Sequence, residues 1–383
     1  TLPAQGSPLL TVLASDFKGS GTPISPIVIN YNLTPPGIPG NFSASALPAG
    51  RVRLTWDAPP GKVPSFYRIY RSSDAGTFSP GIVPSVALRI KDSLTVRTFD
   101  DLPAQDGVYY YAVTALDASL NESGASDAAS AVADRAVPTA SLTFETIPPF
   151  GPGAKRLQLT LSKVLASPPL LLFRPFNQTP LSIALSASSP TVWIGTLTVT
   201  SAMNSGVGSF SFQGSDFVGN VGTGLSAGAT ALLDLAGPLG AITLVPTSPV
   251  KAGTVALSLS LTEPVPVAPQ LAYVTAGGST VPVTLSGGGA AWAGTLEIST
   301  GSDGPATFAF SATDVLGNVG ASLTAGGSFV IMTVAPGEPL FPRAIPQKAG
   351  AVRLSWSAPI SGTPASYSVY RDAVRLSSGI VPL

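Results

Sequence analysis

The 383 residues are too many for one small hydrophobic core and indicate two to four domains. Only 10% of the residues are charged, and 20 Lys and Arg balance 20 Asp and Glu, which argues against a nucleic-acid partner held by a basic surface. The chain has no Cys and no His, which excludes disulfides, thiolate or imidazole metal ligands, and His-based catalysis. The 38 prolines exclude long helices, whereas short alternating runs of Val, Leu, Thr and Ser predict strands.

No run of about 18 apolar residues occurs, so the sequence predicts no membrane-spanning helix. The mean hydropathy of +0.37 is high for a chain with so little charge. Either part of the surface is covered by a partner, or the many small residues raise the index. The sequence shows neither an initiator Met nor a signal peptide, and we therefore expect a mature piece, or a window of a longer chain.

Residues 1–36 predict the end of a domain rather than the beginning of one. Strands are expected at 10–16 and 25–30, and the stiff run of Pro and Gly at 35–37 marks a boundary. The segment matches residues 308–337, so we interpret 1–36 as the C-terminal part of a repeat that occurs complete further along the chain.

Residues 37–137 form a complete unit of the size of a small β-sandwich. Val52, Leu54 and Trp56 alternate with polar residues, which predicts that they face inward. Further strands are expected at 66–71, 86–90, 97–99, 109–115 and 128–132.

A set of motifs in this unit resembles bacterial fibronectin type III domains. These motifs are a Trp strand ending at Trp56, the Tyr-Arg-Ile-Tyr-Arg run at 67–71, and a Tyr-rich strand from Tyr109 that leads to an Asp, Asn and Glu loop at 117–122. The resemblance implies that Trp56 lies in the core. It also implies that one of Tyr109–Tyr111 forms a tyrosine corner, whose hydroxyl bonds to the backbone near Leu102, with Tyr110 the simplest to face outward. No Arg-Gly-Asp tripeptide is present, so receptor recognition is not implied.

The same unit begins again at 337–383, where Trp356 and Tyr370 repeat Trp56 and Tyr70 at an offset of 300 residues. We interpret 337–383 as the N-terminal half of a second fibronectin-like domain, with Trp356 in its core. A half-sandwich would expose its inner face to water. We therefore expect that the protein continues, or that another chain completes the sheet, and continuation is the favoured alternative.

Residues 138–236 and 237–336 are two copies of a second repeat. Trp193 and Trp292 correspond at an offset of 99, and the Asp-x-x-Gly-Asn-x-Gly motif at 216–222 returns at 314–320. The motif resembles bacterial immunoglobulin-like modules of surface and secreted proteins. The predicted fold class is thus all-β, an elongated array of tandem immunoglobulin-like and fibronectin type III β-sandwiches.

Asp216 and Asp314 are weak calcium candidates, because oxygen-rich loops bind hard cations. Each loop offers only one carboxylate and one amide, from Asn220 or Asn318, whereas calcium takes six to eight oxygens. The favoured alternative is that each Asp accepts backbone N–H groups of its own loop, while Gly and Asn adopt positive φ. We expect no metal and no cofactor.

No catalytic constellation is evident, and we predict that the protein is not an enzyme and has no catalytic residues. Without His, a nucleophilic Ser would need a Lys base. The carboxylate pairs Asp57 with Asp101 and Asp92 with Asp100 could be imagined at a glycosidase site, but such residues usually cap turns.

Two functions fit these features. The first is a non-enzymatic extracellular structural protein, a stalk, fibre or surface layer that self-associates or contacts neighbouring surface proteins. The alternative is an adhesin or a carbohydrate-associated accessory spacer of a secreted polysaccharide-acting protein, which would present a flat aromatic strip to glycans. The tryptophans at 56, 193, 292 and 356 could stack on sugars, but their alternating apolar strands favour core positions.

Overall fold

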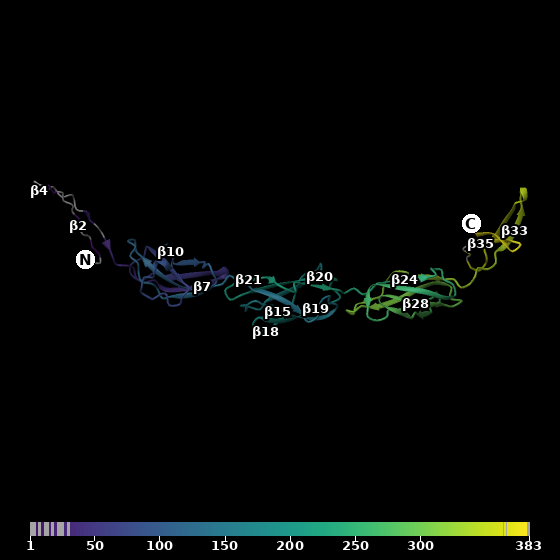
Figure 1. Ribbon diagram of the computed structural model, residues 1–383, viewed down its shortest axis with the longest axis horizontal. Coiled ribbons are helices and arrows are strands. Elements are labelled where there is room, and N and C mark those ends of the chain that lie inside the picture. Colours follow the sequence, from purple (N-terminus) through teal and green to yellow (C-terminus); the bar gives the residue numbers. More distant parts are fainter. Residues whose placement is uncertain are drawn as a thin grey trace.

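The computed structural model describes residues 31–362, 364 and 366–380, and before them short strands at 5–6, 9–10, 15–16, 19–20 and 27–28. Three compact units lie end to end, with a smaller one at the C-terminal end (Figure 1). The described elements are strands and three short 3₁₀ helices, η1 (Pro48–Gly50), η2 (Val86–Leu88) and η3 (Lys348–Gly350). The predicted all-β fold class is confirmed. None of the described helices has the length and apolar character needed to cross a membrane.

The N-terminal segment contains three short antiparallel pairs, β1 with β6, β2 with β5 and β3 with β4. Their bounds are β1 (Gln5–Gly6), β2 (Leu9–Leu10), β3 (Ser15–Asp16), β4 (Gly19–Ser20), β5 (Ile27–Val28) and β6 (Tyr31–Asn32). Most of the domain end predicted at 1–36 lies outside the described residues.

The first sandwich packs a three-stranded sheet, β11-β8-β7, against a four-stranded sheet, β10-β9-β12-β13. The strands are β7 (Gly40–Leu47), β8 (Arg51–Asp57), β9 (Phe66–Ser72), β10 (Arg89–Leu94), β11 (Thr98–Asp101), β12 (Gly107–Leu116) and β13 (Ala129–Ala133). Trp56 is 4% exposed and lies between Phe42 and Tyr67, with ring centroids 6.4 and 5.4 Å away. The prediction that Trp56 is a core residue is confirmed.

The three consecutive tyrosines of β12 have different environments. Tyr111 is buried, and its hydroxyl donates to the carboxylate of Asp101 at 2.9 Å. Tyr109 donates to the backbone oxygen of Gln105 at 3.1 Å, so the predicted bond to backbone near Leu102 is replaced by one closer in sequence. Tyr110 does face the outer side of its sheet, but it is half-buried there against a small cluster that contains Phe78, because the chain after β9 folds back over this face.

The second and third sandwiches share one topology, except that the single strand β28 of the third stands where the second has the paired strands β18 and β19. In the second, β18-β19-β15-β14-β22 face β17-β16-β20-β21 with β23 on β20; in the third, β28-β25-β24-β31 face β27-β26-β29-β30 with β32 on β29. The second contains β14 (Thr139–Phe144), β15 (Gly153–Leu161), β16 (Leu170–Arg174), β17 (Leu181–Ser182), β18 (Leu185–Ser189), β19 (Val192–Val199), β20 (Gly206–Ser215), β21 (Val221–Gly222), β22 (Gly224–Leu225) and β23 (Thr230–Leu233). The third contains β24 (Gly240–Val245), β25 (Gly253–Val265), β26 (Gln270–Val274), β27 (Thr280–Pro282), β28 (Leu285–Ile298), β29 (Gly304–Thr313), β30 (Val319–Gly320), β31 (Leu323–Ala325) and β32 (Ser328–Ile331).

Each of these sandwiches has a separate hydrophobic core. The core of the second is rich in Leu and Phe, with Trp193 half-buried against it, and the core of the third contains Trp292 at 9% exposure. The alternating burial along β15, β20 and β25 follows the two-residue period of a strand with one covered face.

The C-terminal unit consists of two two-stranded sheets, β33 with β34 and β35 with β36. The bounds are β33 (Leu340–Pro346), β34 (Val352–Ser357), β35 (Tyr367–Arg371) and β36 (Val374–Ile380). Trp356 packs edge-on against Tyr367 at 5.2 Å but is only half-buried, and both line an open apolar cavity. The described residues include no counterparts of β12 and β13, which belong to the sheet facing Trp56 in the first sandwich. The core position of Trp356 stays a prediction.

Candidate functional site at the joints between sandwiches

The loop after β20 folds around the carboxylate of Asp216. One oxygen accepts the backbone N–H groups of Val218 and Asn220 at 3.1 and 2.8 Å, and the other accepts the side-chain amide of Asn220 at 2.9 Å. Gly219 has a φ of 90°, which a glycine adopts without strain. Asp216 is 5% exposed, so the burial of its charge is offset by these donors.

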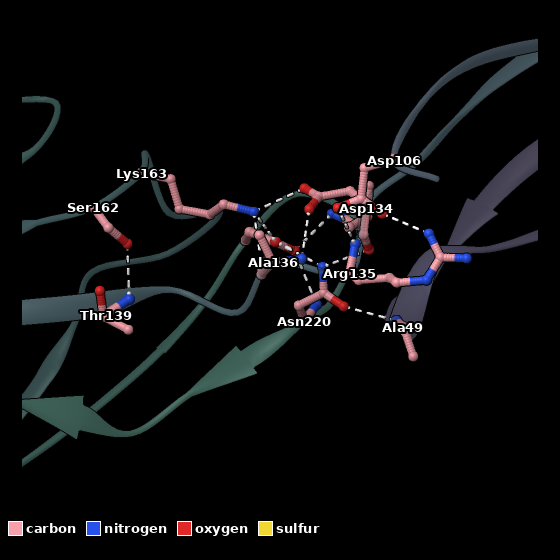
Figure 2. A network of polar contacts seen from close by, with 11 residues as sticks. Ala49, Asp106, Asp134, Arg135, Ala136, Thr139, Ser162, Lys163 and Asn220 are labelled. Atoms are coloured by element: carbon pink, nitrogen blue, oxygen red, sulfur yellow. Dashed lines mark hydrogen bonds and ion pairs between the residues drawn. The ribbon is translucent and has the colours of Figure 1, made fainter. Parts of the chain in front are cut away.

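Asn220 extends this loop to the linker between the first two sandwiches, residues 134–138, here called the middle joint (Figure 2). Its Nδ2 donates to the backbone oxygen of Asp134 at 3.0 Å. Its Oδ1 accepts the backbone N–H of Ala49, in the turn η1 of the first sandwich, at 2.8 Å. One buried amide therefore connects the second sandwich to the linker and to the first sandwich.

Lys163 adds an ionic contact to the middle joint. Its Nζ lies 2.8 Å from a carboxylate oxygen of Asp134, 2.9 Å from one of Asp216, and 2.6 Å from the backbone oxygen of Ala136 (Figure 2). Burial by itself lowers the pKa of Lys163, but its two carboxylate partners outweigh this effect and raise the pKa above the ordinary value. The positive charge thus lies between two negative ones.

The linker is also held from the side of the first sandwich. The backbone N–H of Gly50 donates to the backbone oxygen of Asp134 at 2.9 Å. Arg135 donates to the carboxylate of Asp106 at 2.6 Å and to the backbone oxygen of Pro103. Both neighbouring sandwiches therefore fix the backbone of the middle joint.

The same Asp-x-x-x-Asn arrangement, here called the joint clamp, occurs at two more places. In the first sandwich, Asp117 accepts the backbone N–H of Asn121 at 2.9 Å, and Asn121 Nδ2 donates to the backbone oxygen of Asn32. Lys62 contacts the Asp117 carboxylate and the backbone oxygen of Thr34, as Lys163 does in the middle joint. This joint, residues 32–39, is called the first joint.

The third sandwich holds its preceding linker in the same way. Asp314 accepts the backbone N–H of Asn318 at 2.8 Å, and Asn318 Nδ2 donates to the backbone oxygen of Asp234 at 3.0 Å. Residues 234–238 are called the third joint. The position of Lys163 is occupied here by Glu263, whose carboxylate lies with those of Asp234 and Asp314 in one group with oxygens within 4.8 Å of one another.

The calcium candidates Asp216 and Asp314 both lie in joint clamps. Their oxygens accept N–H groups, as the favoured alternative predicts, and Gly219 and Gly317 adopt positive φ. Asn220 and Asn318 do not adopt positive φ, contrary to that expectation; their side chains instead bond to the linker. The expectation that these loops bind no metal stays a prediction.

The imagined carboxylate pairs are engaged elsewhere. Asp101 is bound by Arg71 and Tyr111, and Asp57 accepts from Asn41. Asp92 and Asp100 are each paired with an arginine, Arg68 and Arg53 respectively. These contacts fit structural roles.

The sequence did not identify the joint clamp as a unit. The clue was present, because Asp and Asn recur four residues apart at 117, 216 and 314, each time after a long apolar strand. The partners Asn32, Lys62, Asp134 and Lys163 lie far away in sequence and show no motif of their own.

Acid is expected to weaken the first joint clamp. Burial opposes ionisation of Asp117, but hydrogen bonds from Lys62 and Asn121 outweigh it and lower the pKa to about 2, from an ordinary value of 3.8. Since the folded-state pKa is depressed, this stabilisation is present above the ordinary pKa and is lost as pH falls from about 4 towards about 2. Urea unfolding of the first sandwich at several pH values would measure it. The variant Asp117→Asn should lose less stability than the parent in this window, and equal losses would contradict the prediction.

Comparisons with known proteins find similar architectures among solved structures. No family model matches the chain, and no curated protein matches it. A tetra-tandem repeat in the extending region of a large adhesion protein is 14% identical and covers 83% of this chain and 87% of its own, with a TM-score of 0.28. An I-band fragment of titin is 14% identical over 76% of this chain and 99% of its own, with a TM-score of 0.32. The FN1–FN3 domains of chicken CNTN1 are 15% identical over 78% and 99%, with a TM-score of 0.22. These TM-scores are low, and the assignment of the chain to tandem immunoglobulin- and fibronectin-like sandwiches rests on its sheets and cores.

Proposed function

We propose that this protein is a non-enzymatic extracellular spacer, a stalk, fibre or surface-layer component that sets distance and direction by joining sandwiches end to end. The units of the proposal are 37–137, 138–236, 237–336 and 337–383, with 1–36 as the end of a preceding repeat. Its resemblance to modules of surface and secreted bacterial proteins supports a location outside the cell.

The joint clamp is the observation that carries this proposal. A flexible string of domains needs no specific contact between a domain and its linker, and inter-domain motion is the default when interfaces are small. Here the same loop binds the preceding linker carbonyl three times, through Asn121, Asn220 and Asn318. Two of these joints add a lysine, and Pro-rich linkers further restrict the backbone.

Lateral association is a second part of the proposal. Only 10% of the residues are charged and 40 are glycines, so neighbouring copies meet little charge repulsion and few bulky side chains. Electron microscopy of the native assembly tests this part, and dispersed monomers at high concentration would contradict it while leaving the spacer role intact.

Removing the clamps is expected to make the array flexible. In the triple variant Asn121→Ala, Asn220→Ala and Asn318→Ala, the linker carbonyls lose their amide donors, so the joints should bend more freely. We expect the maximum dimension and radius of gyration from small-angle X-ray scattering to fall, with each sandwich still folded by circular dichroism.

A matched control removes a similar bond inside one sandwich. Asn204 Nδ2 donates to the backbone oxygen of Phe176 at 3.0 Å, and both residues belong to the second sandwich. Asn204→Ala should leave the scattering dimensions unchanged. A parent protein as compact and variable in solution as the triple variant would sink the spacer proposal.

A further inference from the structure

The middle and third joints are built from equivalent residues, which allows a direct comparison. Asp134 and Asp234 each present a carbonyl to the clamp asparagine. Ser162 and Thr262 each accept the backbone N–H of the residue that begins the next sandwich, at 2.8 and 3.0 Å. The following residue is therefore in the same place in both joints, and it is Lys163 in one and Glu263 in the other.

This exchange reverses the electrostatics of the joint. Lys163 lies between two carboxylates and pairs with both. Glu263 instead adds a third carboxylate to Asp234 and Asp314, which are the charged groups that face it, and in the described residues no Lys or Arg lies within 4.0 Å of these three. Burial, together with Asp234 and Asp314, raises the pKa of Glu263, as expected for a carboxylate that meets like charges.

A second difference concerns the direct contact between sandwiches. In the middle joint, the amide of Asn220 also accepts the backbone N–H of Ala49 across the joint. In the described residues, the amide of Asn318 makes no such bond to the second sandwich, and its bond across the joint is the one to Asp234. The third joint thus lacks this hydrogen bond between sandwiches and carries a cluster of three carboxylates.

We propose that the third joint is an electrostatic hinge, a built-in compliant point between the second and third sandwiches, whereas Lys163 locks the middle joint. The proposal rests on the proposed spacer function and adds where the spacer bends. The repulsion between Glu263 and the two aspartates weakens the attachment of the linker to the third sandwich. The bond from Asn318 to Asp234 keeps the linker in contact with that sandwich.

A reciprocal charge swap tests the hinge. The chain has no Cys, so spin labels can be placed in pairs, Ser130 with Ser211 across the middle joint and Ser211 with Thr307 across the third. All three positions are exposed on strands. Pulsed electron paramagnetic resonance then gives the distribution of distances across each joint, with a chelator present to remove divalent cations.

We expect a broader distribution across the third joint than across the middle one in the parent protein. Glu263→Lys should narrow the distance distribution across the third joint to the width found across the middle joint. Lys163→Glu should broaden the distribution across the middle joint. Glu263→Gln, which removes the charge with little change of shape, should partly narrow the distance distribution across the third joint. High salt should narrow the distribution across the third joint, because it screens the repulsion between carboxylates, and should broaden that across the middle joint, because it screens the attraction of Lys163 to its two carboxylates.

Other outcomes separate this proposal from the spacer function. Equally narrow distributions that the swaps leave unchanged would overturn the hinge and leave the spacer role standing. Broad distributions at both joints would contradict the spacer role itself. The distance distribution across the third joint could instead respond only to calcium added without chelator, and not to salt or to Glu263→Gln. A bound cation would then control this joint, and the proposal would be overturned.

Discussion

The variant Gly222→Ala is expected to destabilise the second sandwich by more than about 3 kcal/mol, which is at the upper end of the cost of overpacking. A Cβ at Gly222 would lie 1.7 Å from the backbone oxygen of Pro138, the last residue of the middle joint. Two backbones meet there, so no side-chain rotation can relieve the clash. The equivalent Gly320 would place a Cβ 1.8 Å from the backbone oxygen of Pro238, and Gly320→Ala should affect the third sandwich in the same way.

Gly224 provides the matched control. It lies two residues further along the chain, and a Cβ there would meet its nearest neighbour, Thr139 Cγ2, at 3.6 Å, an ordinary contact. Denaturant unfolding should show a large loss for Gly222→Ala and little change for Gly224→Ala. Similar stabilities of the two variants would show that the linker does not pass against β21 as described.

Phe173→Ala is expected to cost the second sandwich about 3–5 kcal/mol and to leave the third sandwich unchanged. Phe173 is fully buried on β16, and its ring lies 4.6 Å from that of Phe210, centre to centre. The cores of the second and third sandwiches share no residue, so their stabilities should be independent. Differential scanning calorimetry would then show that one melting transition moves to lower temperature.

Tyr273→Ala in the third sandwich tests the same idea in reverse, because Tyr273 pairs there with Phe308 and Phe329. It should lower the melting temperature of the third sandwich and leave that of the second unchanged. Phe217→Ala removes the same atoms as Phe173→Ala, but from a side chain that is 77% exposed, and it should shift neither melting transition. A single transition that shifts with every core variant would show that the sandwiches unfold as one body.

The sequence predicted much of the architecture because its signals are local. Alternation along Val52, Leu54 and Trp56 has the period of a strand, and it correctly predicted their burial. Repeats separated by 98 to 100 residues indicated copies of one unit, and the second and third sandwiches do share one topology. A motif alone does not decide the burial of a Trp: Trp56 and Trp356 share a motif, but only Trp56 has strands packed opposite it within the described residues.

The strands and the all-β class could be predicted from residue spacing along the chain, because the period of a strand and the distance between repeated motifs are local properties of the sequence. The tertiary structure alone decided the joints. Asn220 and Asp134 are 86 residues apart. Only the folding of the second sandwich brings the loop after β20, which carries Asn220, against the linker that precedes the first strand of that sandwich. The same closure gives Lys163 and Glu263 opposite roles, because the effect of a charge depends on the charges that folding places beside it.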